Sequence, residues 1–303
     1  MAFLFLHGDL HLDAHTVLSW WSWDPFTVML LALSGALYGV GLARLWRRAG
    51  VGQGIRRWEA GCFAAGWLAL FVALVSPVDA LGDILFSAHM AQHELLILVA
   101  APLMVLGRPL APFLWALPRE SREVAGSWSQ APAFAAFWRF LTAPLAVFLI
   151  HGLALWIWHL PALYQATLGD DFIHALQHLS FFLSASLFWW TLIHGRFGKL
   201  GYGAAVLYVF VTSLHSGLLG ALLTFAPHLW YPIYEARTSR WGLSPLEDQQ
   251  LAGLIMWIPA GVLFIFLGLG LFAAWLGEAE RRVAHTRSET LLRTLEGGTG
   301  HGG

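Results

Sequence analysis

The chain has 303 residues, of which 58% are hydrophobic and only 12% are charged, and its formal net charge is −1. Soluble domains carry about 25% charged residues, so this composition excludes an ordinary soluble protein and predicts an integral membrane protein. The charge balance excludes nucleic acid as a partner, and the single cysteine, Cys62, excludes an intrachain disulfide or a Cys-x-x-Cys metal site.

The N-terminal segment, residues 1–24, contains the sequence HGDLHLDAH. It has no basic start, long apolar run or A-x-A site, so it is not predicted to be a signal peptide. His7, His11 and His15 recur every four residues and would form one stripe on a helix. Two interpretations stay open: a surface site that collects metal ions, and a polar leader without fixed structure.

Seven apolar stretches are long enough to cross about 30 Å of hydrocarbon. They lie at about 25–46, 58–76, 81–106, 143–160, 171–193, 203–225 and 249–276. The sequence therefore predicts an all-α, polytopic membrane helical bundle of seven transmembrane helices over residues 25–276. The tail, residues 277–303, is charged and ends in GGTGHGG, which predicts partial disorder. The longest connection, 107–142, is rich in Pro and Trp and predicts one or two short helices at the headgroups.

Lysine and arginine residues predict the orientation. If the connection after the first stretch is cytoplasmic, Arg237 and Arg240 lie outside, and the other 15 of the 17 basic residues lie inside. The positive-inside rule then places the N-terminus outside and the C-terminus in the cytoplasm, which agrees with an odd number of spans. The sequence thus predicts a multi-pass membrane protein.

This orientation assigns a depth to each histidine. At 1.5 Å per residue, five histidines on four helices lie about 10 to 18 Å below the outer ends of their helices. They are His89, His93, His151, His178 and His215, while His159 and His174 lie nearer the outer surface. One such histidine is ordinarily a hydrogen-bonding residue, but polar groups in a membrane are costly. Five at one depth predict a cluster that binds metal or relays protons.

The residues around this cluster have simpler interpretations. Glu94 follows His93 directly and points about 100° away, so it is predicted to orient or pair with a neighbouring histidine. Met90 and Met256 are predicted to be packing residues, and Cys62 to be a buried thiol in the inner half. Imidazole ligands suit copper, zinc, iron and nickel.

Three blocks of sequence resemble one family. The first is HMAQHELLILVAAPLMVLGRPL, which starts at His89; the second runs from Trp156 to Trp190, and the third from Leu219 to Gly261. In this order they resemble the CtaG family of seven-helix cytochrome c oxidase assembly proteins. That family was first met in Gram-positive bacteria and is unrelated to the proteobacterial copper chaperone of the same name.

The resemblance implies a function in the maturation of a haem–copper oxidase, by helping to load copper into its copper-B centre. It implies a multi-pass location in a bacterial cell (inner) membrane, with subunit I of the oxidase as a partner within the lipid bilayer and a periplasmic copper donor. The cargo would be Cu(I) or Cu(II). The family motif falls on His89, His93, His159, His174, His178, Asp248 and Gln249.

Other functions remain open. Haem b could be held between His89 and His178 or between His151 and His215, since bis-histidine ligation needs two facing imidazoles. A membrane di-iron hydroxylase would carry its histidine boxes at the cytoplasmic face, opposite to the predicted side. A metal-free assembly scaffold would use its histidines only for hydrogen bonds or proton relay. No nucleophile–base pair, phosphate loop or cofactor fingerprint predicts catalysis.

Overall fold

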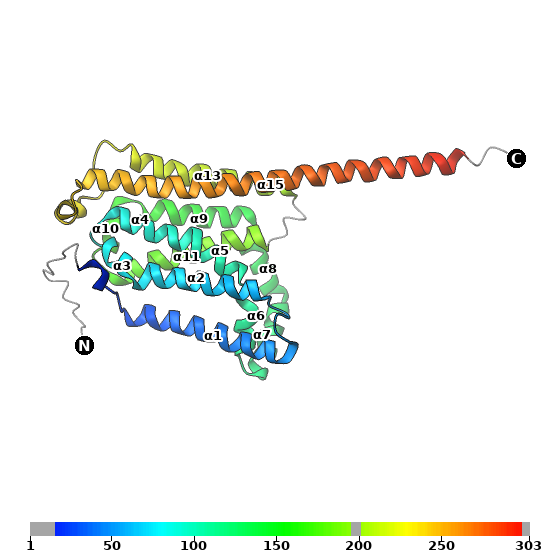
Figure 1. Cartoon of the computed structure of the whole chain (residues 1–303), viewed down its shortest axis with the longest axis horizontal. Helices are drawn as coiled ribbons and strands as arrows, with labels where there is room; N and C mark the ends of the chain where they lie inside the picture. Colours follow the sequence, from blue (N-terminus) through cyan, green and yellow to red (C-terminus); the bar gives the residue numbers. More distant parts are fainter. Residues whose placement is uncertain (1–15, 195–200, 299–303) are drawn as a thin grey trace.

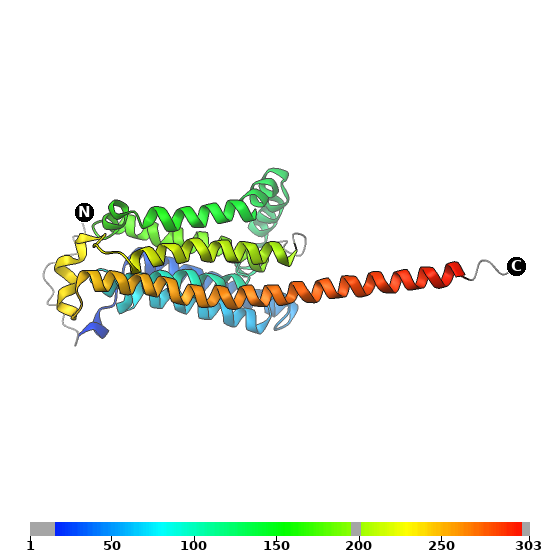
Figure 2. The same ribbon diagram turned by 90° about the horizontal axis from the view of Figure 1, so that it is seen from above.

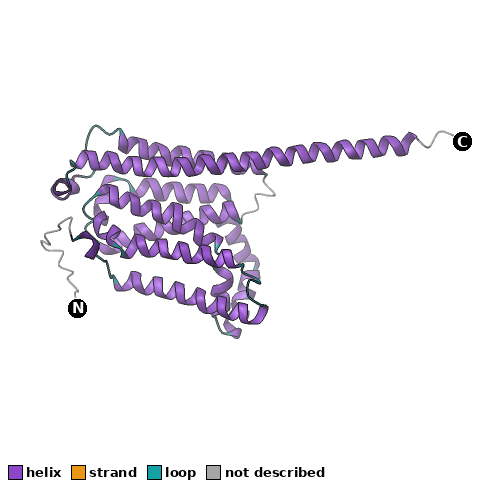
Figure 3. Cartoon of the chain, in the orientation of Figure 1, coloured by secondary structure: helices purple, strands orange, loops and turns teal. Residues whose placement is uncertain are grey.

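The protein was analysed as a computed structural model that describes residues 16–194 and 201–298. Every regular element within these ranges is helical, which confirms the all-α prediction (Figure 3). The candidate metal-collecting histidines His7, His11 and His15 lie outside the described residues.

The long helices are α1 (Pro25–Ala49), α2 (Arg57–Val75), α9 (Pro144–Trp158), α11 (Asp171–Ile193), α13 (Tyr202–Thr224) and α15 (Pro245–Gly298). One further span is built from α4 (Phe86–Glu94), a π-helical turn η2 (Leu95–Ala100) and α5 (Ala101–Leu106). Short helices connect them: η1 (Val17–Ser19), α3 (Pro77–Gly82), α6 (Leu110–Ala116), α7 (Arg119–Gln130), α8 (Pro132–Leu141), α10 (Pro161–Thr167), η3 (Pro232–Tyr234), α14 (Glu235–Thr238) and η4 (Ser239–Trp241).

The long helices run side by side, and α1, α4, α11 and α15 all begin at the same end of the bundle (Figures 1 and 2). We call this end the N-terminal end. The α10 helix and the segment between α13 and α15 also lie there. The α6, α7 and α8 helices lie at the opposite end, where they fill the predicted connection 107–142 with three short helices.

Six helices are long and apolar enough to cross a membrane, and a seventh span arises if α8 and α9 are taken as one bent helix. The predicted fourth span is the exception, because α9 has only 15 residues and α8 meets it at an angle of 57°. Large apolar side chains face outward along the bundle, including Phe210 (60% exposed) and Phe266 (71% exposed). This outward apolar surface is that of a multi-pass membrane protein.

The last helix is longer than the predicted span. The α15 helix continues from Pro245 to Gly298 without a break, and its second half projects beyond the other helices (Figure 1). The charged segment after residue 276 is therefore helical as far as Gly298, and only residues 299–303 of the predicted tail lie outside the described chain.

Local sequence signals determine where the helices at the N-terminal end begin. Asp24 caps α1 by accepting a hydrogen bond from the Thr27 N–H at 2.7 Å, and Asp170 caps α11 in the same way. Before α15, the Ser244 N–H donates to Glu247 Oε2 at 2.8 Å and the Glu247 N–H donates to Ser244 Oγ at 3.2 Å. This reciprocal pair is a capping box, and it places Asp248 in the first turn of α15.

Candidate metal centre

Three histidines meet between α4 and α11 near the N-terminal end. They are His89, His174 and His178. Each offers one ring nitrogen as a ligand atom, and these three nitrogens all lie within 4.8 Å of one another. We call these residues the histidine trio. The i, i+4 spacing of His174 and His178 puts both rings on one face of α11, with ring centroids 4.2 Å apart. His89 completes the group from α4, with its ring centroid 5.2 Å from that of His174.

The ring nitrogens of the trio are available for a ligand. His89 is fully buried, and His178 is 8% exposed. Within the described part of the chain, His89 Nδ1, His174 Nε2 and His178 Nε2 are buried without a hydrogen-bond partner. Unpaired buried polar atoms are rare and costly, so they point to a missing partner. Nitrogen atoms that bind one metal ion lie about 2.0–2.1 Å from it. Small rotations of the three side chains would bring their ring nitrogens from the observed spacing to this distance from a shared ion.

His93 lies one helical turn deeper on α4 than His89. Its ring centroid is 4.4 Å from that of His89 and 5.3 Å from that of His178. Both ring nitrogens of His93 are buried and have no hydrogen-bond partner among the described residues. On its far side the ring of His159, at the end of α9, lies 6.2 Å away. The predicted ligands His89, His93, His159, His174 and His178 therefore form one contiguous group of imidazoles.

Asp248 positions the helix that carries His89 and His93. Its carboxylate accepts hydrogen bonds from the backbone N–H of Phe86 at 2.6 Å and of Ser87 at 3.2 Å, and from the Ser87 hydroxyl. Because these N–H groups are at the start of α4, a residue of α15 acts as the cap that α4 lacks in its own sequence. Asp248, predicted as a supporting residue, thus acts through α4.

Gln249, the other predicted supporting residue, holds the loop before η3. Its Oε1 accepts a hydrogen bond from the Trp230 N–H at 2.7 Å, and its Nε2 donates to the His228 carbonyl at 3.2 Å. The neighbouring Tyr231 hydroxyl donates to the His159 carbonyl at 2.8 Å. Through this loop, Gln249 supports the end of α9 where His159 lies.

Several residues that support the site were not predicted from the sequence. Gln177 Oε1 lies 3.2 Å from His89 Nε2, and the ring centroid of Tyr164 lies 5.2 Å from that of His89. Gln92 Nε2 donates to the Ala73 carbonyl at 2.8 Å and to Asp79 Oδ1 at 2.7 Å. Burial raises the pKa of Asp79, while hydrogen bonds from Ser22 and Gln92 oppose that shift. The only available signal was helical spacing, since Gln177 lies three residues after His174.

His151 and His215 form a separate group. His151 Nδ1 pairs with Ser184 Oγ at 3.1 Å. The His215 ring packs on Phe148 with ring centroids 5.2 Å apart, and it faces Gly152. Both His215 ring nitrogens are buried and have no hydrogen-bond partner in the described ranges. The predicted layer of five histidines is thus divided, because depth along a helix does not specify the direction in which a side chain points.

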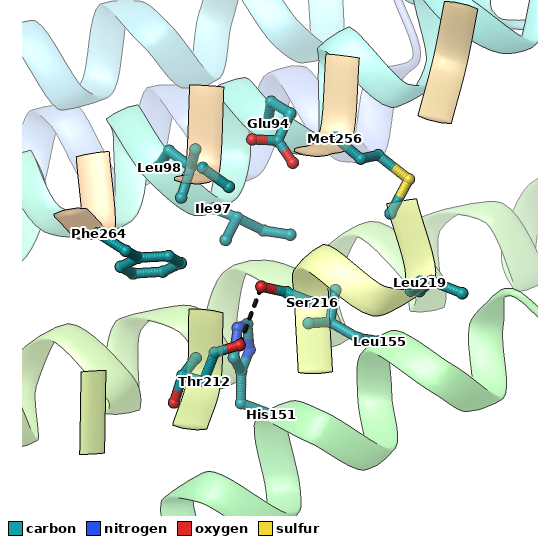
Figure 4. A pocket seen from close by; sticks show the side chains of 11 residues that line it. Glu94, Ile97, Leu98, His151, Leu155, Thr212, Ser216, Leu219, Met256 and Phe264 are labelled. Atoms are coloured by element: carbon teal, nitrogen blue, oxygen red, sulfur yellow. Dashed lines mark hydrogen bonds between the residues drawn. The ribbon is translucent and has the colours of Figure 1, made fainter. Parts of the chain in front are cut away.

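Glu94 belongs with this second group. It lines a cavity of about 20 Å³ together with His151 of α9 and with Thr212 and Ser216 of α13 (Figure 4). Such a volume accommodates one water molecule. Glu94 Oε2 is buried without a hydrogen-bond partner among the described residues. Glu94 therefore points away from the trio rather than orienting it.

One family of known proteins matches most of the chain. The model of the cytochrome c oxidase caa3 assembly factor family matches residues 36–278, which include all the histidines of the site. The chain is 27% identical over 278 residues to uncharacterized proteins of Mycobacterium bovis and Mycobacterium tuberculosis, covering 88% of this chain and 41% of each relative. A similar protein of Mycobacterium leprae is also 27% identical, with 86% of this chain and 40% of the relative covered.

The chain spans about two fifths of the length of these curated relatives. No solved structure matches it. The family model covers well over half of the 303 residues and contains the helices that carry the imidazole group. The chain therefore belongs to the family of cytochrome c oxidase caa3 assembly factors.

Proposed function

We propose that this protein binds copper through the histidine trio and helps to load it into the copper-B centre of a haem–copper oxidase. Family membership indicates oxidase assembly, with the oxidase and membrane lipids as partners. Copper as the cargo, subunit I as the direct partner, a periplasmic copper donor and location in a bacterial inner membrane are parts of the proposal.

The observation that carries the proposal is the convergence of His89, His174 and His178 with unpaired, buried ring nitrogens. A scaffold that used these histidines only for hydrogen bonds would leave fewer nitrogens without partners. The rings of His89 and His178 are adjacent, with centroids 5.6 Å apart and planes tilted by 47°. This spacing leaves no room for a porphyrin between the two rings, which supports a small ion over haem.

The position of the trio also suits transfer of an ion. It lies near the N-terminal end of the bundle, which the basic residues predict to face the periplasm. His174 is half-buried and His89 is fully buried, so the trio extends from an accessible ring to an inaccessible one. An ion held by few imidazoles can pass to histidines of the oxidase by stepwise ligand exchange.

Metal analysis of the purified protein tests this proposal. After loading with Cu(II), which suits imidazole ligands, we expect about one copper ion per chain in the wild type and less than a tenth of that in the double variant His89→Ala/His178→Ala, because only one ligand of the trio remains. The matched control is His228→Ala, which removes an exposed histidine of the same end of the bundle. A cell that carries the double variant should also show low oxidase activity.

Three results would contradict the proposal. The double variant could retain stoichiometric copper, in which case the trio is not the site. The wild type could contain no copper and show a Soret band near 400–430 nm, which would indicate bound haem. The wild type could also show neither copper nor a Soret band and still support oxidase maturation, which would indicate a metal-free scaffold.

A further inference from the structure

Met90 lies beside the imidazole group and takes part in it. This methionine, one residue after His89, is fully buried on α4. Its Sδ atom is 3.4 Å from His159 Nε2. The thioether and the imidazole come from helices 69 positions apart in the sequence, so the contact results from the tertiary structure and not from helical spacing.

The protonation of His159 makes this contact unusual. His159 Nδ1 lies 2.6 Å from the Leu155 carbonyl oxygen, which can only accept a hydrogen bond. Nδ1 therefore carries the proton, and in the neutral ring Nε2 presents a lone pair. The sulfur of methionine has no hydrogen to donate and also presents lone pairs. Two electron-pair donors thus face each other without a proton between them.

An imidazolium at His159 would supply that proton, but the site does not favour it. His159 is 3% exposed, and an isolated buried charge is strongly disfavoured without an opposite charge. The rings nearest to His159 are those of His93, Tyr164 and Phe181, and none of these residues is acidic. A metal ion bound by both atoms would accept the lone pairs of Met90 Sδ and His159 Nε2, and no buried imidazolium would be needed.

His93 supplies a third donor. Its ring centroid lies 6.2 Å from that of His159, and both of its nitrogens lack partners within the described residues. On its other side the His93 ring is within 5.3 Å of that of His178. His93 is therefore the neighbour that the histidine trio and the Met90–His159 pair have in common.

We propose that Met90 Sδ, His159 Nε2 and a ring nitrogen of His93 form a second metal site, selective for a soft monovalent ion, Cu(I). This inference rests on the proposed copper function and refines it. A thioether is a soft ligand that selects Cu(I), whereas the trio offers only imidazole nitrogen, which also binds Zn(II) and Cu(II). The second site therefore gives a selectivity for Cu(I) that three histidines alone do not.

The two sites are connected through His93, whose ring centroid lies 5.3 Å from that of His178 and 6.2 Å from that of His159. An ion that moves between the sites would exchange one ligand at a time through His93, with no change in its oxidation state. Packing alone explains the burial of Met90 among aromatic rings. It does not explain why its sulfur faces a nitrogen lone pair.

X-ray absorption at the copper edge tests the inference directly. The purified full chain, carrying Cys62→Ser to remove its only thiol, is loaded anaerobically with Cu(I). We expect a sulfur scatterer in the copper shell, because Met90 coordinates the ion. The variant Met90→Leu, close to Met in volume, should lose that scatterer and bind Ag(I), a Cu(I) surrogate, at least ten times more weakly. Its Zn(II) binding should be unchanged.

The control is Met256→Leu, which removes the other buried thioether of the same apolar cluster and should keep the scatterer. Copper bound to the wild type with only nitrogen neighbours would refute the thioether site and leave the proposed copper function standing. A scatterer that survives Met90→Leu and disappears in Met256→Leu would refute the choice of residue. Wild type that binds no copper at all would refute both proposals.

Discussion

Asp248 contacts α4 although it lies 162 positions later in the sequence. Its two carboxylate oxygens accept hydrogen bonds from the first free N–H groups of that helix. A carboxylate at a helix N-terminus is stabilised by the aligned peptide dipoles as well as by the hydrogen bonds. Asp248 is fully buried, so its carboxylate is shielded from bulk solvent. A single side chain therefore determines where His89 and His93 stand relative to α15.

Replacing Asp248 with alanine should weaken both the fold and the metal site. Two buried N–H groups and the Ser87 hydroxyl lose their acceptor, which costs about 1–3 kcal/mol for each unpaired group. We expect a lower midpoint of thermal unfolding in detergent and weaker copper binding. The control is Glu235→Ala, which removes an exposed carboxylate of α14 and should change stability by less than about 0.5 kcal/mol. Equal midpoints for the two variants would contradict the capping role.

At the scale of helices, small residues determine how closely the spans pack. A Cβ added to Gly253 of α15 would lie 2.5 Å from the Thr224 backbone N and 2.6 Å from the Gly220 carbonyl of α13. Within a membrane, van der Waals packing at such contacts replaces the hydrophobic driving force between helices. The contact fixes α15, and with it Asp248 in its first turn.

The variant Gly253→Ala should therefore separate α13 from α15 and destabilise the protein by about 1–3 kcal/mol, as overpacking does. Gly268→Ala is a matched control on the same helix, because a Cβ there meets nothing within 4 Å. It should be neutral or raise stability by up to about 1 kcal/mol through helix propensity. Thermal unfolding in detergent compares the two, and an unchanged midpoint for Gly253→Ala would show that α13 and α15 do not pack this closely.

At the scale of the whole molecule, the distribution of basic residues predicts the direction of insertion. Among the basic residues that the structure describes, Arg237 and Arg240 are the two at the N-terminal end, in the segment between α13 and α15. The arginines of the loop after α1, of α7 and α8, and of the α15 extension lie at the opposite end (Figure 1). The positive-inside rule therefore predicts that the N-terminal end, with the imidazole group, faces outward.

Cysteine labelling tests this orientation. In a Cys62→Ser background, the exposed residues His228 and Gln53 are each replaced by cysteine. A membrane-impermeant maleimide should label His228→Cys in intact spheroplasts and Gln53→Cys only after lysis. The reverse pattern would place the candidate metal centre on the cytoplasmic side and would contradict delivery of copper from the periplasm.

Much of the fold was predictable because the bilayer imposes a simple rule on sequence. A span needs about 20 apolar residues, and such runs are visible without any tertiary information. Six of the seven predicted stretches coincide with helices long enough to cross, from α1 to α15. The shortness of α9 and the helical continuation of α15 to Gly298 were not predicted, since the 57° bend before α9 and the extension depend on local backbone geometry.

The candidate site also contains features that the sequence predicts and features that it does not. The i, i+4 spacing of the histidines is visible in the sequence, and it is enough to place His89 with His93, and His174 with His178, on common helix faces. The packing of the helices was needed to show that Glu94 and His151 line a separate cavity, that His215 packs on Phe148, and that Met90 meets His159. The physical reason is that spacing specifies a face of one helix, whereas a binding site needs faces of several helices, and their rotation is set by packing.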